Sequence, residues 1–202
     1  MLSFIAGGIT HSFGLYLIPV TEYLEVGRET FGFAFALQGF IAGAGAFIFG
    51  AISDKYGSGI ASFIGAILFI VGLVLFANVG SSTDIIISQC MIGFGASGTG
   101  VSVTLGAVGR VATDKNRTLY LGVVMAGAST GQFIILPIST FLLQTFDWSQ
   151  SLIYLAILSS SMLFFAFALN FSSKSKSSIE GTNQSIKEAL IEALYSKSFI
   201  LL

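Results

Sequence analysis

Long uncharged, mostly apolar stretches alternate with short charged clusters along most of this chain. The stretches cover residues 1–21, 30–53, 56–83, 85–109, 118–146 and 148–173, each about 20 to 30 residues long. A membrane-spanning helix needs roughly 20 apolar residues, whereas a barrel strand needs about half as many and alternates apolar with polar side chains. The pattern therefore predicts six transmembrane helices and an all-α integral membrane fold.

Composition supports this class. Of the 202 residues, 54% are hydrophobic and 9% are charged, and the mean hydropathy is +0.89. Soluble globular domains carry about 25% charged residues, so this chain has too few charges to cover a water-exposed surface. The net charge of −1 gives no reason to expect a nucleic-acid partner. The single cysteine, Cys90, lies in an apolar run and is interpreted as a small buried hydrophobe.

The basic residues predict an orientation. Eight of the nine Lys and Arg residues lie after the second, fourth and sixth stretches: Lys55, Arg110, Lys115, Arg117, Lys174, Lys176, Lys187 and Lys197. The other connections hold Arg28 alone. Because Lys and Arg are enriched in cytoplasmic loops, both termini and the loops at about 53–58, 109–117 and 172–197 are expected in the cytoplasm. The first stretch has no basic n-region, so it is not interpreted as a signal peptide.

The fourth stretch contains a match to the nucleotide-binding pattern G-x-G-x-x-G, reading GFGASG at 93–98. Such a loop needs a strand-to-helix turn facing water, whereas here the apolar run continues on both sides. Small residues in membrane helices instead let two backbones approach closely. We therefore expect no nucleotide cofactor and assign these glycines to helix packing near the middle of the fourth helix. The small residues expected at helix contacts are Gly93, Gly95 and Gly98 here, Gly39, Gly43 and Gly50 in the second stretch, and Gly122, Gly127 and Gly131 in the fifth.

Enzyme chemistry is not indicated. Hydrolytic or metal catalysis needs several polar side chains converging on one point. The chain has one histidine, and no carboxylate falls within any apolar stretch. The sequence predicts no catalytic residue and no metal site.

His11 is the most informative polar residue, because it lies about midway along the first stretch, where an ionisable group is costly. It either lines a cavity, binding substrate or a proton, or is a neutral side chain hydrogen-bonded to a neighbouring helix. The same two interpretations apply to Tyr16, Gln38, Ser129 and Gln132, as substrate contacts or as interhelical hydrogen bonds. Gln89, nearer a helix end, is a weaker candidate for substrate contact.

Two further features concern helix placement. The third stretch contains FIGAILFIVGLVLFA, which is almost wholly apolar and is expected to face lipid at the periphery. Pro19 and Pro137 lie near the outer ends of the first and fifth stretches and are candidates to bend those helices.

The loop after the second stretch reads GAISDKYGSG, in which Gly50, Asp54, Lys55 and Gly57 match the G-x-x-x-D-[RK]-x-G motif of the major facilitator superfamily. The family usually continues with Arg or Lys, where this chain has Ser58 and Gly59. The resemblance implies a gate at the cytoplasmic ends of the helices. The candidate gate residues are Gly50, Asp54, Lys55 and Gly57 together with Arg110 and Arg117 of the next loop on that side.

A second match narrows the resemblance. Residues 115–132 read KNRTLYLGVVMAGASTGQ and resemble the K-R-R-x-L-A-x-G…A-G-x-x-x-G signature of monocarboxylate-transporter-like and oxalate/formate-antiporter-like members. The matching residues are Lys115, Arg117, Leu119, Gly122, Ala126, Gly127 and Gly131, whereas Asn116 and Tyr120 depart from the signature.

The resemblance implies the N-terminal half of a twelve-helix fold, each half being built from inverted three-helix repeats. Residues 1–171 are then the six-helix bundle, 172–197 a central cytoplasmic loop with an amphipathic helix, and 198–202 the start of a seventh helix. The chain is accordingly expected to be a fragment whose partner is the missing C-terminal six-helix half. A multi-pass protein of the bacterial inner (plasma) membrane is implied.

The function implied is secondary transport, by alternating access, of a small organic solute, with a monocarboxylate or related organic anion favoured. Transport is by proton symport or by exchange. An anion within the membrane needs a positive partner, and that partner is either His11 or a residue of the absent half. The alternatives are efflux of a neutral or cationic amphiphile and a non-transporting six-helix scaffold.

Overall fold

The computed structural model describes residues 1–113 and 115–173, and every regular element in this part of the chain is helical. The elements are α1 (Leu2–Ser12), η1 (Phe13–Tyr16), α2 (Leu17–Tyr23), α3 (Arg28–Tyr56), α4 (Ser58–Ala77), α5 (Ser82–Thr99), α6 (Val101–Val111), α7 (Arg117–Thr145) and α8 (Trp148–Ser173). The bundle predicted to end at 171 thus continues as helix to Ser173. The predicted amphipathic helix and the predicted start of a seventh helix lie outside the described residues.

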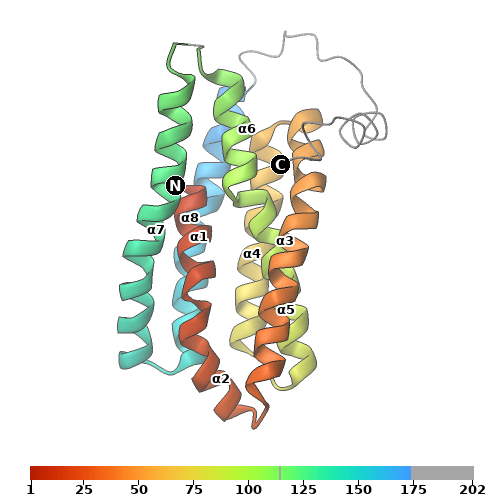
Figure 1. Cartoon of the computed structure of the whole chain (residues 1–202), viewed down its shortest axis with the longest axis vertical. Coiled ribbons are helices and arrows are strands. Elements are labelled where there is room, and N and C mark those ends of the chain that lie inside the picture. The colour runs from red at the N-terminus through yellow and green to blue at the C-terminus, as the bar shows by residue number, and fades with distance from the viewer. Residues whose placement is uncertain (114, 174–202) are drawn as a thin grey trace, which may run out of the picture.

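Six spans are long and apolar enough to cross a membrane, which confirms the predicted all-α membrane fold. They are Leu2–Tyr23, Arg28–Tyr56, Ser58–Ala77, Ser82–Arg110, Arg117–Thr145 and Trp148–Leu169, here called spans 1 to 6. The helices run lengthwise through one bundle, with α2 at one end and α6 reaching the other (Figure 1). Gly57 joins spans 2 and 3 at the α6 end of this bundle.

Two spans are interrupted. In span 1 the short 3-10 helix η1 separates α1 from α2, and it precedes Pro19 rather than starting there. In span 4 the backbone of Gly100 is extended, with ψ −173°, between α5 and α6. The fourth predicted helix is therefore found as one span, with a break at Gly100 that the sequence did not predict. A side chain there would meet the Ala96 carbonyl oxygen at 2.7 Å, so glycine suits this break.

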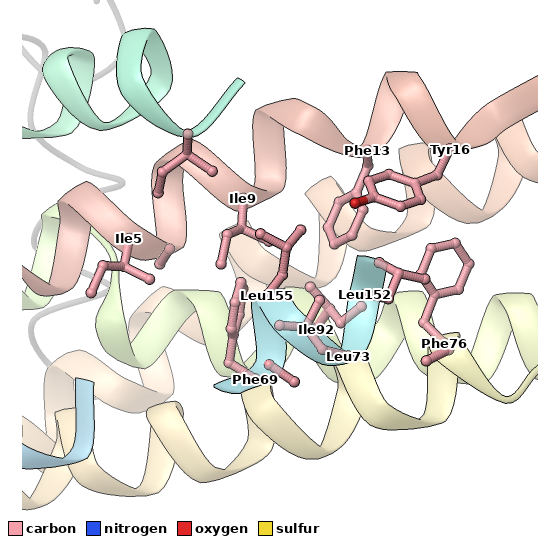
Figure 2. Packing of buried hydrophobic residues seen from close by; sticks show 14 of the residues in the cluster. Ile5, Ile9, Phe13, Tyr16, Phe69, Leu73, Phe76, Ile92, Leu152 and Leu155 are labelled. Atoms are coloured by element: carbon pink, nitrogen blue, oxygen red, sulfur yellow. The ribbon is translucent and has the colours of Figure 1, made fainter. Parts of the chain in front are cut away.

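The core lies between span 1, span 3 and span 6. Figure 2 shows Ile9 and Phe13 of span 1 pointing toward Phe69 and Phe76 of α4. The rings of Phe13 and Phe76 meet edge to face, with centroids 5.7 Å apart. Such packing is the main source of association between helices in lipid, where burial of apolar surface gives little net gain.

Glycines allow close backbone approach at several helix contacts. A Cβ at Gly95 of α5 would lie 2.7 Å from the Phe69 Cα in α4, and one at Gly98 would lie 2.9 Å from the Gly65 Cα. A Cβ at Gly93 would lie 3.1 Å from the Gln38 Cα in α3. These residues of the 93–98 segment therefore lie between helices, as close packing requires.

Span 5 packs on span 1 in the same manner, but through one of its glycines. A Cβ at Gly131 would lie 2.8 Å from the Phe4 Cα, whereas one at Gly127 would have no neighbour within 4 Å among the described residues. The predicted packing role of Gly127 is therefore not found here, because the buried residues of α7 are Ala128, Gly131, Ile135 and Ser139. The other predicted glycines that lie open are Gly39, Gly43, Gly50 and Gly122.

The third span also differs from its prediction. One face of α4 is buried, including Ala61, Gly65, Phe69 and Leu73, because α5 and α8 pack against it. The opposite face keeps apolar residues such as Ile67 exposed. The helix is therefore half buried within this bundle rather than wholly facing lipid.

Candidate functional site

The loop motif forms an ion pair with the end of span 4. Arg110, near the end of α6, donates from Nη1 to Asp54 Oδ1 at 2.5 Å. Asp54 lies in the last turn of α3, so the pair links span 2 to span 4 at the α6 end of the bundle. Both side chains contact water, with exposures of 44% for Arg110 and 74% for Asp54.

Two buried hydroxyls complete this cluster. Arg110 donates from Nη2 to Ser53 Oγ at 2.7 Å and also to Ser58 Oγ. The two serine oxygens lie 3.0 Å apart, within hydrogen-bond distance of each other. Ser53 is 4% exposed and Ser58 is 5% exposed, so these oxygens depend on protein donors. We call Asp54, Arg110, Ser53 and Ser58 the Arg110 cluster.

The hydroxyls change the energetic balance of the cluster. An exposed ion pair alone contributes about 0–1 kcal/mol. A hydrogen bond to a charged group contributes about 1.5–3 kcal/mol, and its loss inside the protein leaves a buried oxygen without a donor. The bonds to Ser53 and Ser58 therefore hold the guanidinium in addition to Asp54, and they lie in a more buried environment.

The turn at Gly57 brings these groups together. Gly57 has φ 95° and ψ 150°, and its N–H donates to the Ser53 carbonyl at 3.0 Å. This backbone conformation is nearly confined to glycine. Gly57 follows Tyr56, the last residue of α3, and precedes Ser58, the first residue of α4, so the motif glycine positions both halves of the cluster.

We expect Gly57→Ala to destabilise the protein by about 1–3 kcal/mol, because a Cβ strains this conformation. The matched control is Gly50→Ala in the same motif, where a Cβ meets nothing within 4 Å. Alanine favours a helix interior by about 0.8–1 kcal/mol, so the control should be neutral or more stable. Thermal unfolding of the purified full-length protein measures both. Equal melting temperatures for the two variants would contradict the role of Gly57.

The remaining candidate gate residues stay outside the Arg110 cluster. Lys55 lies over the ring of Tyr56, 5.2 Å from its centroid. Arg117 begins α7, and one of its guanidinium nitrogens lies 3.7 Å from where a Cβ at Gly109 would stand. Neither makes an ion pair within residues 1–113 and 115–173. Gly50 is open, one turn before Asp54.

His11 faces away from the other described helices. Its ring is exposed, and Nδ1 lies 2.7 Å from the Gly7 carbonyl one turn earlier in its own helix. A carbonyl oxygen only accepts, so Nδ1 carries the hydrogen and Nε2 is the acceptor of the neutral ring. The structure therefore shows no interhelical bond to His11 from the described residues and leaves Nε2 available to a ligand or a proton.

Span 5, which carries Gln132, packs beside span 1. A Cβ at Gly7 would lie 3.9 Å from the Ala128 carbonyl oxygen of α7. Contacts of Phe4 with Gly131 and of Gly8 with Ile135 show that spans 1 and 5 run parallel. Gln132 directly follows Gly131 and is partly buried. Ser129, also on α7, is exposed.

Tyr16 and Gln38 lie in the interior instead. The Tyr16 hydroxyl is 2.7 Å from Ser151 Oγ of α8 and fully buried, so it joins spans 1 and 6 in this conformation. Gln38 of α3 and Gln89 of α5 are both buried, and Gly93 of α5 packs against the backbone of Gln38. The carboxamides of both have no hydrogen-bond partner among the described residues. Tyr16, Gln38 and Gln89 are thus buried, whereas His11 is exposed.

Sequence reasoning missed Ser53, Ser58 and Ser151 as partners of predicted residues. Serines are common in membrane helices, and several of those here bond a carbonyl of their own helix, as Ser12 and Ser159 do. The departure from the family motif at Ser58 was the one available signal. Among the residues that the structure describes, no three His, Cys, Asp or Glu side chains gather to hold a metal ion.

Comparison with known proteins gives two findings. The family model described as Major Facilitator Superfamily matches residues 1–202. Monocarboxylate transporter 11 of Mus musculus is 24% identical to this chain over 148 residues, which is 73% of this chain and 33% of the mouse protein. The chain thus spans about a third of the length of this curated relative.

Proposed function

This chain belongs to the major facilitator superfamily, and from that premise we propose that it forms the N-terminal half of a secondary transporter working by alternating access. A transporter of this kind opens a central site to one side of the membrane at a time, as its two halves rock against each other. The missing half, the lipid bilayer and a small organic solute are its partners in this proposal.

The Arg110 cluster carries the proposal. Alternating access requires contacts at the helix ends that form in one state and break in the other. Asp54 is 74% exposed at such an end and is held by Arg110 from a second span. A carboxylate in this position is available to a helix N-terminus or a basic residue of the second half, which would close this side.

The solute we propose is a monocarboxylate or related organic anion, carried with a proton or by exchange. The signature at residues 115–132 supports this, and so does the name of the mouse relative. Within the described spans, Lys and Arg stand only near the span ends, as Lys55, Arg110 and Arg117 do. The positive partner of the anion is then His11 or a residue of the second half.

The loop charges support an orientation with the Arg110 cluster in the cytoplasm. Eight Lys and Arg residues follow spans 2, 4 and 6, against one in the opposite connections. We therefore propose that both chain ends face the cytoplasm, and that the membrane is a bacterial inner membrane.

Asp54→Asn in the full-length protein should slow uptake of a short monocarboxylate such as pyruvate by about three- to tenfold, equivalent to about 0.7–1.4 kcal/mol. The amide keeps one acceptor for Arg110 but loses the charge, so expression should be unchanged. Initial uptake rates in proteoliposomes measure this.

The control is Glu22→Gln, which removes a carboxylate at the opposite end of the bundle. The gate proposal fails if Asp54→Asn transports at the parental rate. Uptake of a cationic dye but not of pyruvate would favour the efflux alternative, and the absence of any transport would favour the scaffold.

A further inference from the structure

One guanidinium in the Arg110 cluster ties together three helices. Ser53 and Asp54 lie in the last turn of α3, Ser58 is the first residue of α4, and Arg110 comes from α6. Nη1 is used by the carboxylate, and Nη2 is used by both hydroxyls. The two serine hydroxyls therefore accept hydrogen bonds from Nη2, separately from the Nη1 bond to Asp54. We call this pair of hydroxyls the serine seat.

The chemistry of the seat requires a cation with several donors. Arginine carries five N–H donors in a fixed planar fork, whereas lysine has a single ammonium nitrogen. Nη2 has two hydrogens, which match the two serine oxygens. The hydroxyls, 3.0 Å apart, can offer only one hydrogen bond to each other, and both are at least 95% buried. Without Arg110 one of these two oxygens would receive no hydrogen bond from the cluster.

Ser58 stands where the loop motif resembled by this chain continues with Arg or Lys. The Ser58 hydroxyl accepts a hydrogen bond from the Arg110 guanidinium, whereas a lysine or arginine side chain has only donors and would add a like charge to the same turn. The serine at 58 therefore supplies an acceptor for Arg110 that a basic side chain could not supply.

We propose that Ser53 and Ser58 are positioning residues of the gate, which hold the Arg110 guanidinium over the α3–α4 turn whether or not Asp54 is bound. The inference rests on the proposed function, in which Asp54 exchanges partners. Because the buried seat is independent of the exposed carboxylate, Arg110 stays in place when Asp54 leaves. When Asp54 returns, Arg110 already has the rotamer that binds it, so the ion pair re-forms without the entropic cost of ordering this side chain.

The test is a double-mutant cycle in the full-length protein, read by hydrogen exchange of the backbone amides of residues 53–60. Ser53→Ala with Ser58→Ala should speed this exchange by about tenfold, since two charged hydrogen bonds at a helix junction are lost. Arg110→Lys should give a similar increase. In the Arg110→Lys background the serine changes should add less than about twofold, because their effect passes through the guanidinium.

Two variants keep the cycle interpretable. Ser62→Ala removes a hydroxyl one turn further along α4 that is 1% exposed and has no partner within the described residues, so exchange at 53–60 should not change. Ser58→Thr retains the hydroxyl and should restore slow exchange. If the double alanine variant does not fold, Ser58→Ala alone enters the cycle in its place.

The inference is overturned if the serine substitutions accelerate hydrogen exchange equally in the parental and the Arg110→Lys backgrounds, because that result indicates a packing role. It is also overturned if they change nothing in either background. Failure of the gate itself appears in a different measurement, as parental uptake by Asp54→Asn. If Asp54→Asn transports at the parental rate while the exchange cycle gives the expected result, the two serines position Arg110 structurally but have no role in transport.

Discussion

Gly95→Leu should leave little or no folded protein. A Cβ alone at this position would lie 2.7 Å from the Phe69 Cα and 2.8 Å from the Gly65 carbonyl oxygen, and both atoms belong to the backbone of α4. Overpacking against movable side chains costs about 1–3 kcal/mol, and here no side chain can move aside. Because total stability is about 5–15 kcal/mol, separating α4 from α5 by a leucine removes much of it.

The smaller substitution Gly95→Ala tests the same contact with less damage, and it has a matched partner in Gly127→Ala. Both put a methyl group on a helical glycine, but at Gly127 no described atom lies within 4 Å. We expect Gly95→Ala to lower the melting temperature and Gly127→Ala to leave it unchanged or raise it, given alanine's preference for helices. Size-exclusion profiles and thermal unfolding of the full-length protein measure these effects. Similar losses for both alanine variants would contradict the assignment of close packing to Gly95.

These two glycines show what the sequence can and cannot predict in a membrane protein. The bilayer sets the length of each apolar stretch, so the spans could be located from hydropathy to within a few residues. Which face of a helix packs inward is a different matter. Lipid-facing and core-facing side chains are both apolar, so the pattern within a span hardly distinguishes Gly127 from Gly131. The same ambiguity explains why α4 was predicted to be peripheral although half of it is buried.

The break within span 4 could not be predicted from the sequence either. Gly100 follows Gly98 in a run of small residues, and the sequence shows no proline or charge at the point where α5 ends. Beyond this break, α6 is linked to α1 by the bond between Ser3 and Thr104 at 2.9 Å. Such a contact across 101 residues is not encoded in any local pattern.

The candidate gate was also predictable from the sequence only in part. The loop motif identified Asp54 and Gly57 because the turn is local, and the charge distribution placed Arg110, Arg117 and Lys55 at one end of the bundle. The structure was needed to select Arg110 as the partner of Asp54 and to add the two serines. The selection depends on the position of α6 beside the α3–α4 turn, which the sequence leaves open.

The polar residues within the membrane carry the remaining question of how a charged solute is held. Apart from Tyr and Cys side chains, His11 is the one ionisable residue of the described spans that lies away from a span end. Its Nδ1–H is bonded to the Gly7 carbonyl, so Nε2 is the ring nitrogen that can meet a ligand. Gln132 lies on α7, which packs against α1, and carries a carboxamide that can donate to a carboxylate oxygen.

His11→Gln in the full-length protein should therefore raise the apparent KM for a monocarboxylate by about tenfold. A charged imidazole that donates from Nε2 gives the carboxylate a charge-assisted hydrogen bond, whereas glutamine keeps a hydrogen-bonding group without the charge.

The control is Ser12→Ala, the next residue, whose hydroxyl bonds Ile9 within the core and should leave the apparent KM unchanged. Initial uptake rates at several solute concentrations measure the apparent KM. A variant with the parental KM would show that His11 takes no part in binding, and would assign the positive partner of the anion to the second half of the protein.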